Sequence, residues 1–200
     1  METIEAINDR RSIRHFEDEP IPDDILRQIL KAGCYAPSAH NSQPWKFIVL
    51  KGDKKNELGE AFLNISKEER YKEYTGFYVN RLLKYAGRIV KESPITIAVF
   101  NKGSFCGSAS KYFRQSKKEV LHIMEVQSIA AAIENMLLAC HDQGLGAVWL
   151  GVPLLVPQEL IEDFFNTKNE LMAIIPMGYP SKKRAIEKKI DIDKHIIYFD

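Results

Sequence analysis

Residues 36–45 read APSAHNSQPW, a segment of small, amide and hydroxyl side chains between two prolines. The prolines restrict the backbone, so the loop can hold its polar groups in place with little conformational freedom. It runs directly into residues 46–50, whose apolar side chains predict a strand. A rigid polar loop of this kind can hold a flat heterocycle. Taken alone, the segment fits equally well an ordered turn that Asn41 caps and Trp45 anchors in the core.

A cationic cluster precedes this loop, where residues 10–14 read RRSIR. Arg10 and Arg14 are four positions apart, so on a continuing helix they share a face. With Arg11 and the Ser12 hydroxyl they can donate hydrogen bonds to phosphate oxygens. The alternative is that cations at the end of a helix only offset its dipole. Together, the cluster and the loop predict a bound cofactor that resembles a nucleotide.

Composition limits the classes of protein to consider. The 200 residues are 45% hydrophobic, enough for one domain with a well-formed core. A formal net charge of +1 gives no overall field that would attract nucleic acid or a membrane surface. The acidic N-terminus and the lack of an apolar run of membrane-spanning length predict a cytoplasmic protein.

The cysteines and histidines do not predict a metal site. Cys34, Cys106 and Cys140 are odd in number and far apart, which favours unpaired thiols in a reducing compartment. The five histidines lack the spacing of metal ligands.

Predicted helices and strands alternate along the chain. Helices are predicted at residues 3–10, from 22 to before 37, between 51 and 93, at 122–143 and at 157–165, and strands at 46–50, 95–100, 147–150 and 171–177. This order fits a domain with a sheet between two layers of helices. Residues 101–118, rich in glycine, serine and aromatic residues, predict a mobile loop or lid.

The helix at 122–143 carries the strongest periodic signal, and Gly144 predicts a left-handed cap at its end. Its middle, residues 129–139, is apolar almost all round, so we expect it to be buried on more than one side, in the core or across a subunit interface.

The glycines that follow, in GLGAVWLG at 144–151, do not form a dinucleotide fingerprint, because a helix precedes them and a strand follows. Gly151 could present its backbone N–H to a ring, or could simply lie in a turn.

Five motifs occur in the order found in one known family. They are RRSIR at 10–14, PSAHNSQPW at 37–45, ENMLLA at 134–139, GLGAVWLG at 144–151 and MGYP at 177–180. On these motifs the chain resembles the nitroreductase family of flavin enzymes. The resemblance implies an α+β fold, a three-layer α/β/α sandwich with a central mixed sheet in an intertwined homodimer. It further implies one FMN-binding domain over residues 1–200, with 101–118 as a lid and 181–200 as a C-terminal tail.

The resemblance also implies roles for individual residues, with FMN bound between two subunits. Arg10, Arg11 and Ser12 match positions near the ribityl phosphate, and Arg14 matches a cation near the flavin N1/O2 edge. Residues Trp149, Leu150 and Gly151 match the segment near N5, and Asn80 matches an asparagine at the ring edge. The residues expected to reach the flavin from the partner chain are Pro37, Ser38, Ala39 and Asn41.

Two positions depart from the family pattern. The tail lacks the usual proline-rich turn, so Lys189 is the best match for the cation on the phosphate, with Arg184 as the competitor. Glu134 stands where many relatives carry glutamine.

The resemblance implies an FMN-dependent oxidoreductase that passes two electrons from NAD(P)H to a small acceptor by a ping-pong route. The acceptor classes it suggests are nitroaromatics, quinones and free flavins. No catalytic side chain is expected, because the flavin N5 carries the chemistry. The alternatives are a non-catalytic flavin-binding or storage protein and a family branch with other chemistry, such as dehalogenation or flavin fragmentation. The basic groups around residues 182–189 leave a nucleic-acid binder as a minor alternative.

Overall fold

The computed structural model describes residues 2–67, 76–105, 118–182 and 191–199. Most of the predicted lid, both candidate tail cations Arg184 and Lys189, and Cys106 therefore lie outside the described residues.

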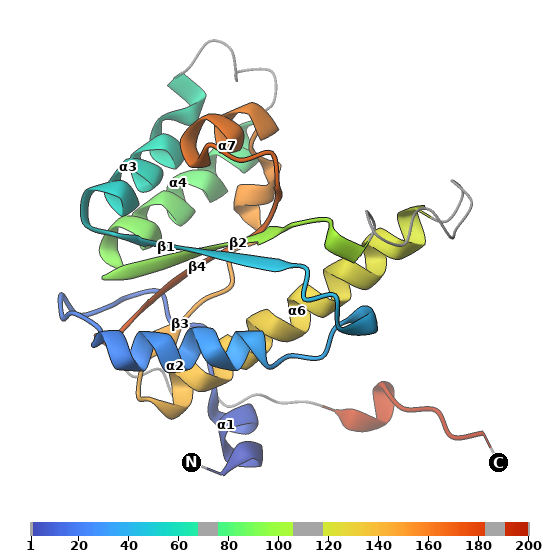
Figure 1. Ribbon diagram of the computed structural model, residues 1–200. Helices are drawn as coiled ribbons and strands as arrows, with labels where there is room; N and C mark the ends of the chain where they lie inside the picture. Colours follow the sequence, from blue (N-terminus) through green and yellow to red (C-terminus); the bar gives the residue numbers. More distant parts are fainter. Residues whose placement is uncertain (1, 68–75, 106–117, 183–190, 200) are drawn as a thin grey trace.

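The protein has a sheet between two layers of helices (Figure 1). Helices α3, α4 and α7 cover one face of the sheet, and α2 and α6 cover the other, with α1 beyond them. The helices are α1 (Thr3–Asp9), α2 (Asp23–Cys34), α3 (Gly52–Asn64), α4 (Phe77–Glu92), α6 (Lys118–Asp142) and α7 (Gln158–Phe165), with short 3-10 turns η1 (Ala39–Asn41), η2 (Ile65–Lys67), η5 (Val152–Leu155) and η6 (Ile192–Lys194). This arrangement confirms the α+β, three-layer prediction.

The sheet contains four strands in the order β1-β2-β4-β3. They are β1 (Trp45–Lys51), β2 (Ile95–Asn101), β3 (Gly146–Ala147) and β4 (Glu170–Gly178). Every pair of neighbouring strands is antiparallel. A parallel bridge between Ser12 and Ala147 adds the N-terminal segment at the β3 edge. The expected mixed sheet is therefore realised only at this edge.

Side chains of the central strands alternate between two cores. On β2, Ile95, Ile97 and Val99 pack toward α2 and α6, whereas Ala98 and Phe100 pack toward α3, α4 and α7. Because helices cover both faces, every residue of β2 is buried. That burial explains why the strand reads as a continuous apolar run rather than an alternating one.

Strand β3 is shorter than the predicted strand at 147–150. Its pairing with β4 continues in the same register, because the Val148 amide donates to the Pro176 carbonyl at 3.2 Å and Leu150 pairs with Ile174. Pro176 has no N–H, so the return hydrogen bond to Val148 cannot form. The ladder is interrupted at that pair, and the sequence prediction did not take account of this missing donor.

The first helix also ends earlier than the cationic cluster suggested. Helix α1 stops at Asp9, and Arg10 has an extended ψ of 132°. The chain then runs along the sheet edge, where the Ile13 amide donates to the Ala147 carbonyl at 3.0 Å. The idea that Arg10 and Arg14 share a face of a continuing helix is therefore wrong, because this tertiary pairing replaces the helix.

Helix α6 is the long central helix of the lower layer. Ile129, Ile133 and Met136 are buried in the core beneath the sheet. Gly144 adopts a φ of +75°, and the Leu145 amide donates to the Cys140 carbonyl at 2.8 Å, which confirms the predicted left-handed cap. Among the described residues, α6 is the one helix long and apolar enough to span a membrane. Buried core helices of soluble proteins meet the same criterion.

Helices α3 and α4 are in close backbone contact through two glycines. A Cβ on Gly87 would lie 2.6 Å from the Gly59 carbonyl oxygen, and a Cβ on Gly59 would lie 2.9 Å from the Gly87 carbonyl oxygen. Neither carbonyl can move without shifting its helix.

We expect Gly87→Ala to lower stability by about 1–3 kcal/mol through overpacking, although alanine is the better helix former. For a chain of this size the melting temperature falls by about 2–4 °C per kcal/mol, which calorimetry can measure. Gly76→Ala is the control, because Gly76 has a φ of −64° and open space around its Cβ position. A melting temperature that rises in Gly87→Ala would contradict the close-packing interpretation.

Candidate functional site

The arginine-rich segment and residues 149–151 lie at the same edge of the sheet. Ser12 pairs with Ala147, two positions before Trp149. The Trp149 side chain is 39% exposed, whereas Leu150 is buried. Gly151 is exposed, and a Cβ built there would meet no atom within 4 Å. The structure therefore brings two of the predicted groups of site residues together and leaves open space beside Gly151.

The three arginines have different surroundings. Arg11 Nη1 donates to the carbonyls of Asn8 at 2.5 Å and Arg10 at 2.9 Å, so its side chain folds back on the end of α1. This is the structural role that the sequence left open for cations at a helix end. Arg14 Nη1 donates to the Ser12 carbonyl at 3.3 Å.

Arg10 lies against Glu134 of α6. Its Nε is 3.3 Å from Glu134 Oε1, an ion-pair distance, and its side chain is 19% exposed. The two groups are not aligned as a hydrogen bond, and Arg10 Nε has no hydrogen-bond partner within the described structure. Glu134, at the position where glutamine was expected from the family pattern, thus places a carboxylate beside the cation expected to bind phosphate.

The loop at residues 37–43 is fixed by hydrogen bonds to itself and to α6. The Ala39 amide donates to Ser128 Oγ at 3.1 Å, and that hydroxyl donates to the Met124 carbonyl at 2.7 Å. Within the loop, the Gln43 amide donates to Ser38 Oγ at 3.1 Å. These bonds fix the loop at a defined position along α6.

The same loop is strained. His40, Asn41 and Gln43 have φ values of 50°, 53° and 45°, in the left-handed region that favours glycine. Such residues cost on the order of 1–3 kcal/mol each, less for asparagine, and occur preferentially at binding sites. Asn41 Oδ1 accepts a hydrogen bond from Gln43 Nε2 at 3.1 Å, a contact between two side chains rather than a cap on the backbone, whereas the buried Trp45 is the anchor that was expected.

Phe105 helps to hold this loop. Its ring stacks on His40 with centroids 5.3 Å apart, and its amide donates to the Glu125 carboxylate at 2.8 Å. The buried Glu125 also accepts from Asn101 Nδ2 at 3.0 Å. Phe105 was expected to belong to a mobile lid; in the structure its amide is bound to a buried carboxylate and its ring is packed on His40, and the lid remains a prediction. The other predicted lid aromatics, Tyr112 and Phe113, lie outside the described residues.

Helix α6 contacts both parts of the predicted site. Ser128 contacts the loop and Glu134 contacts Arg10. They are six positions apart, which corresponds to about 9 Å along the axis and about 120° around it. The loop and the arginine therefore lie against different sides of α6 within one chain.

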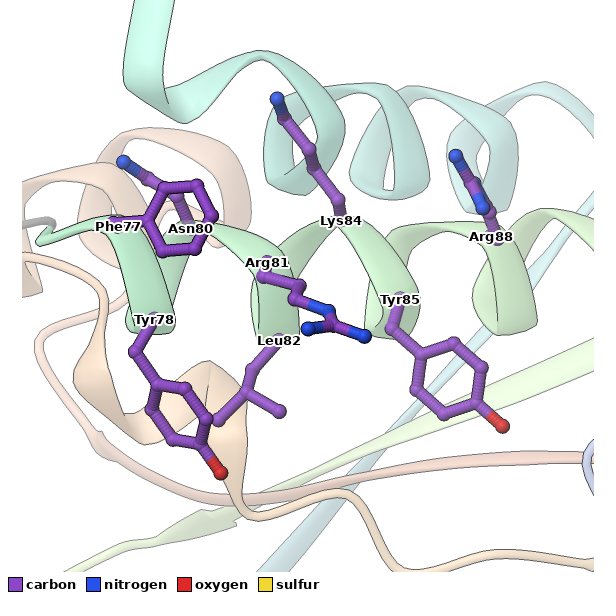
Figure 2. A pocket seen from close by; sticks show the side chains of 8 residues that line it. All are labelled: Phe77, Tyr78, Asn80, Arg81, Leu82, Lys84, Tyr85 and Arg88. Atoms are coloured by element: carbon purple, nitrogen blue, oxygen red, sulfur yellow. The ribbon is translucent and has the colours of Figure 1, made fainter.

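Asn80 lies elsewhere in the fold, in the first turns of α4 and in the layer on the other side of the sheet from α1 (Figure 1). It lines an open hollow of about 870 Å³ on the outer side of α4, shown in Figure 2. The hollow is lined by Phe77, Tyr78, Asn80, Arg81, Leu82, Lys84, Tyr85 and Arg88.

Sequence reasoning missed three residues of this site. Ser128 and Glu125 fix the loop and its neighbour Phe105, and each is a polar residue buried on α6. A polar residue at a core position of an apolar helix is the signal that could have identified them. Ser42 Oγ is buried without a hydrogen-bond partner in the described structure, which nothing in the sequence indicated.

These residues fit flavin mononucleotide. Arg10 keeps its two Nη atoms available for phosphate oxygens, since its nearest carboxylate faces Nε. The half-buried Trp149 and the space beside Gly151 can accommodate a planar ring. The described residues contain no group of three or more His, Cys, Asp or Glu side chains placed to hold a metal ion.

Comparison with known proteins gives consistent matches over almost the whole chain. A model of the nitroreductase family matches residues 7–179. A Methanothermobacter thermautotrophicus protein, provisionally named an NADH dehydrogenase/NAD(P)H nitroreductase, is 32% identical over 197 residues, 97% of this chain and 85% of its own length. Iodotyrosine deiodinase 1 of Sus scrofa is 27% identical over 192 residues, 92% of this chain and 63% of the deiodinase.

A solved structure with FMN supports the same relationship. It is a Desulfovibrio desulfuricans protein, provisionally named a nitroreductase, in complex with FMN. Its TM-score is 0.74 at 26% identity, and the match covers 100% of this chain and 98% of that chain.

The Arg10–Glu134 contact gives a prediction for phosphate binding. Glu134→Gln should raise the affinity for FMN by about two- to tenfold, because it removes a negative charge that repels the phosphate and competes for Arg10. Affinity for riboflavin, which lacks the phosphate, should not change. Fluorescence titration of flavin-free protein measures both.

Glu119→Gln is the matched control, since Glu119 is an exposed glutamate about 22 Å away along the same helix. If Glu134→Gln weakens FMN binding, the carboxylate positions Arg10 rather than competing with the phosphate.

Proposed function

Because the chain belongs to the nitroreductase family, we propose that it is an FMN-dependent oxidoreductase that passes two electrons from NAD(P)H to a small acceptor. The observation that carries this proposal is the pairing of Ile13 with Ala147, which sets the arginine-rich segment beside Trp149 and Gly151. The residues proposed to bind the phosphate and those proposed to flank the ring thus lie at one edge of the sheet. The resemblance to a structure in complex with FMN supports the same cofactor.

Each group of residues has a distinct role in this proposal. Arg10 and Ser12 would hold the phosphate, and Arg14 would provide a cation for the N1/O2 edge of the ring, where a fixed positive charge favours the reduced anion. When bound, the flavin supplies the hydride transfer at N5. Gly151 keeps that face open because it has no side chain, and Trp149 limits access of water to it.

We propose that the site is completed in an intertwined homodimer. The loop and Arg10 lie on different sides of α6, so a second subunit is the source of the loop for each site. Large apolar side chains are exposed on α1 and α6, among them Ile4, Ile7 and Ile123. Residues 191–199 are exposed and extend away from the sheet in Figure 1, where Tyr198 and Phe199 would be covered by a partner.

A cytoplasmic location fits the thiols. Cys34 and Cys140 are both free, and burial raises the pKa of the Cys140 thiol to about 12, so it is unreactive. Free thiols are usual in a reducing compartment.

A second candidate is reductive removal of halogen from an aromatic ring. It is favoured by the match to iodotyrosine deiodinase 1, which is 27% identical over 92% of this chain and 63% of the deiodinase. In that reaction two electrons from NAD(P)H and one proton convert a carbon–halogen bond into a carbon–hydrogen bond, and halide is released. Halide release from a halogenated phenol, without reduction of nitroaromatics, would favour this candidate.

Purified protein should be yellow, and NADH or NADPH should bleach it anaerobically within seconds, with colour returning when a quinone is added. The visible spectrum and chromatography of the heat-released cofactor check the identity of the flavin. A yellow protein that neither coenzyme bleaches would instead be a flavin-binding or storage protein.

Light scattering of the same sample should give the mass of a dimer. An FMN-saturated monomer at micromolar concentration would overturn the shared site.

Arg10→Ala and Lys189→Ala should each weaken FMN binding by about ten- to a hundredfold, the effect of losing one charge-assisted hydrogen bond. Riboflavin affinity should fall far less. Equal losses for both ligands would mean that the residues act through folding or through the ring. A loss in Arg184→Ala but not in Lys189→Ala would assign the tail contact to Arg184.

A further inference from the structure

The outer face of α4 differs from an ordinary solvent-exposed helix face. Phe77, Arg81, Tyr85 and Arg88 recur at intervals of four, four and three residues, which places them within about 80° of one another around the helix. The opposite face, which includes Leu83 and Val90, is buried in the core between the sheet and helices α3, α4 and α7. The helix therefore presents one continuous stripe, which we call the α4 face, defined by Phe77, Tyr78, Arg81, Lys84, Tyr85 and Arg88.

Aromatic side chains on the α4 face are unusually exposed. Phe77 is 87% exposed, Tyr78 70% and Tyr85 47%. Figure 2 shows Tyr78, Leu82 and Tyr85 along one side of the helix, with the Arg81 guanidinium between Leu82 and Tyr85. They border the hollow of about 870 Å³ described above. An exposed cluster of aromatics beside a hollow indicates a binding surface more often than single exposed aromatics do.

The charge on the α4 face is of one sign. Across the described residues, Arg81, Lys84 and Arg88 form no ion pair, whereas Lys91 at the end of the same helix pairs with Glu60. The only acid in α4 is Glu92, the last residue, and it lies beside His15. These three cations give the α4 face a local positive charge in a chain whose net charge is only +1.

The helix that carries the α4 face packs against the turn that follows the proposed reaction site. Turn η5 begins directly after Gly151 and packs against α4, with Val152 against the apolar core of that layer. Asn80, the candidate for the ring edge, lines the same hollow as Arg81. A molecule in the hollow would therefore lie against the helix that also contacts the turn after Gly151.

We propose that the α4 face binds an aromatic substrate that carries a negative charge. Tyr85, which lies beside the Arg81 guanidinium in Figure 2, contacts the ring, and Arg81 donates a forked pair of hydrogen bonds to a carboxylate, sulfonate or phosphate. Two kinds of ligand carry both a planar ring and an anionic group, namely an anionic aromatic acceptor and the nicotinamide coenzyme. The assignment to a substrate rests on the proposed oxidoreductase function, but binding of an aromatic anion does not.

Direct binding tests the site without turnover. Calorimetry of the holoenzyme should show that 4-nitrobenzoate binds more tightly than its neutral methyl ester. Arg81→Gln should lower the affinity for the acid by about three- to tenfold. The ester should bind both proteins alike. Arg27→Gln, an exposed arginine on α2, is the matched control and should change neither. Equal binding of acid and ester, or no effect of Arg81→Gln on either the acid or NADPH, overturns the site.

Half-reactions distinguish the two sources. If the anion is on the acceptor, Arg81→Gln raises the KM for 4-nitrobenzoate and leaves kcat and the KM for the ester unchanged. The rate at which NADH or NADPH bleaches the flavin does not change either. If the coenzyme is the source, the same variant raises the apparent Kd for NADPH in the bleaching step. A protein that binds the acid through Arg81 but transfers no electrons would refute the proposed function and leave the site intact.

Discussion

The hydrogen bond from the Ile13 amide to the Ala147 carbonyl ties the N-terminal arginines to the edge of the sheet, and the proposed site depends on it. This pairing is possible because residue 146 is glycine. A Cβ at that position would lie 2.6 Å from Ile13 Cβ. The arginines proposed to bind phosphate thereby meet the residues after β3 that are proposed to flank the ring. Neither group would form a cofactor site alone.

Helix α6 is the second common element. It buries its apolar side beneath the sheet, and its few polar side chains do the positioning. Ser128 fixes the strained loop, Glu125 fixes the Phe105 ring that stacks on that loop, and Glu134 lies against Arg10. Since a packed helix is rigid, these contacts prearrange polar groups without requiring order in the loops themselves. The strain at His40 and its neighbours is tolerated for the same reason.

Much of the fold could be predicted from the sequence, because local patterns determine it. The periods of α2, α6 and α7 and the apolar runs of β2 and β4 gave their elements to within a few residues. Errors arose where a distant partner decided the local structure. The helix ends before Arg10 because the segment that follows pairs with Ala147, and β3 ends early because Pro176 on β4 has no N–H to donate.

The site was predicted less completely, for the same reason. The motifs identified the arginines, the polar loop and residues 149–151, but not which of these lie side by side. Arg11 illustrates the limit, because sequence cannot distinguish a cation that binds a ligand from one that caps its own helix. Phe105 illustrates it again, since a residue in a glycine- and serine-rich segment is held by a carboxylate twenty positions away.

The placement of Ser128 and Glu134 on one helix makes the spacing between them a structural constant. Inserting or deleting a single residue between them would rotate one contact by about 100° relative to the other and shift it by about 1.5 Å. No loop adjustment could restore both, because each contact is made by a helical side chain. In homologous chains, insertions and deletions should therefore be tolerated before Glu125 or after Gly144. They should be absent between the positions of Ser128 and Glu134.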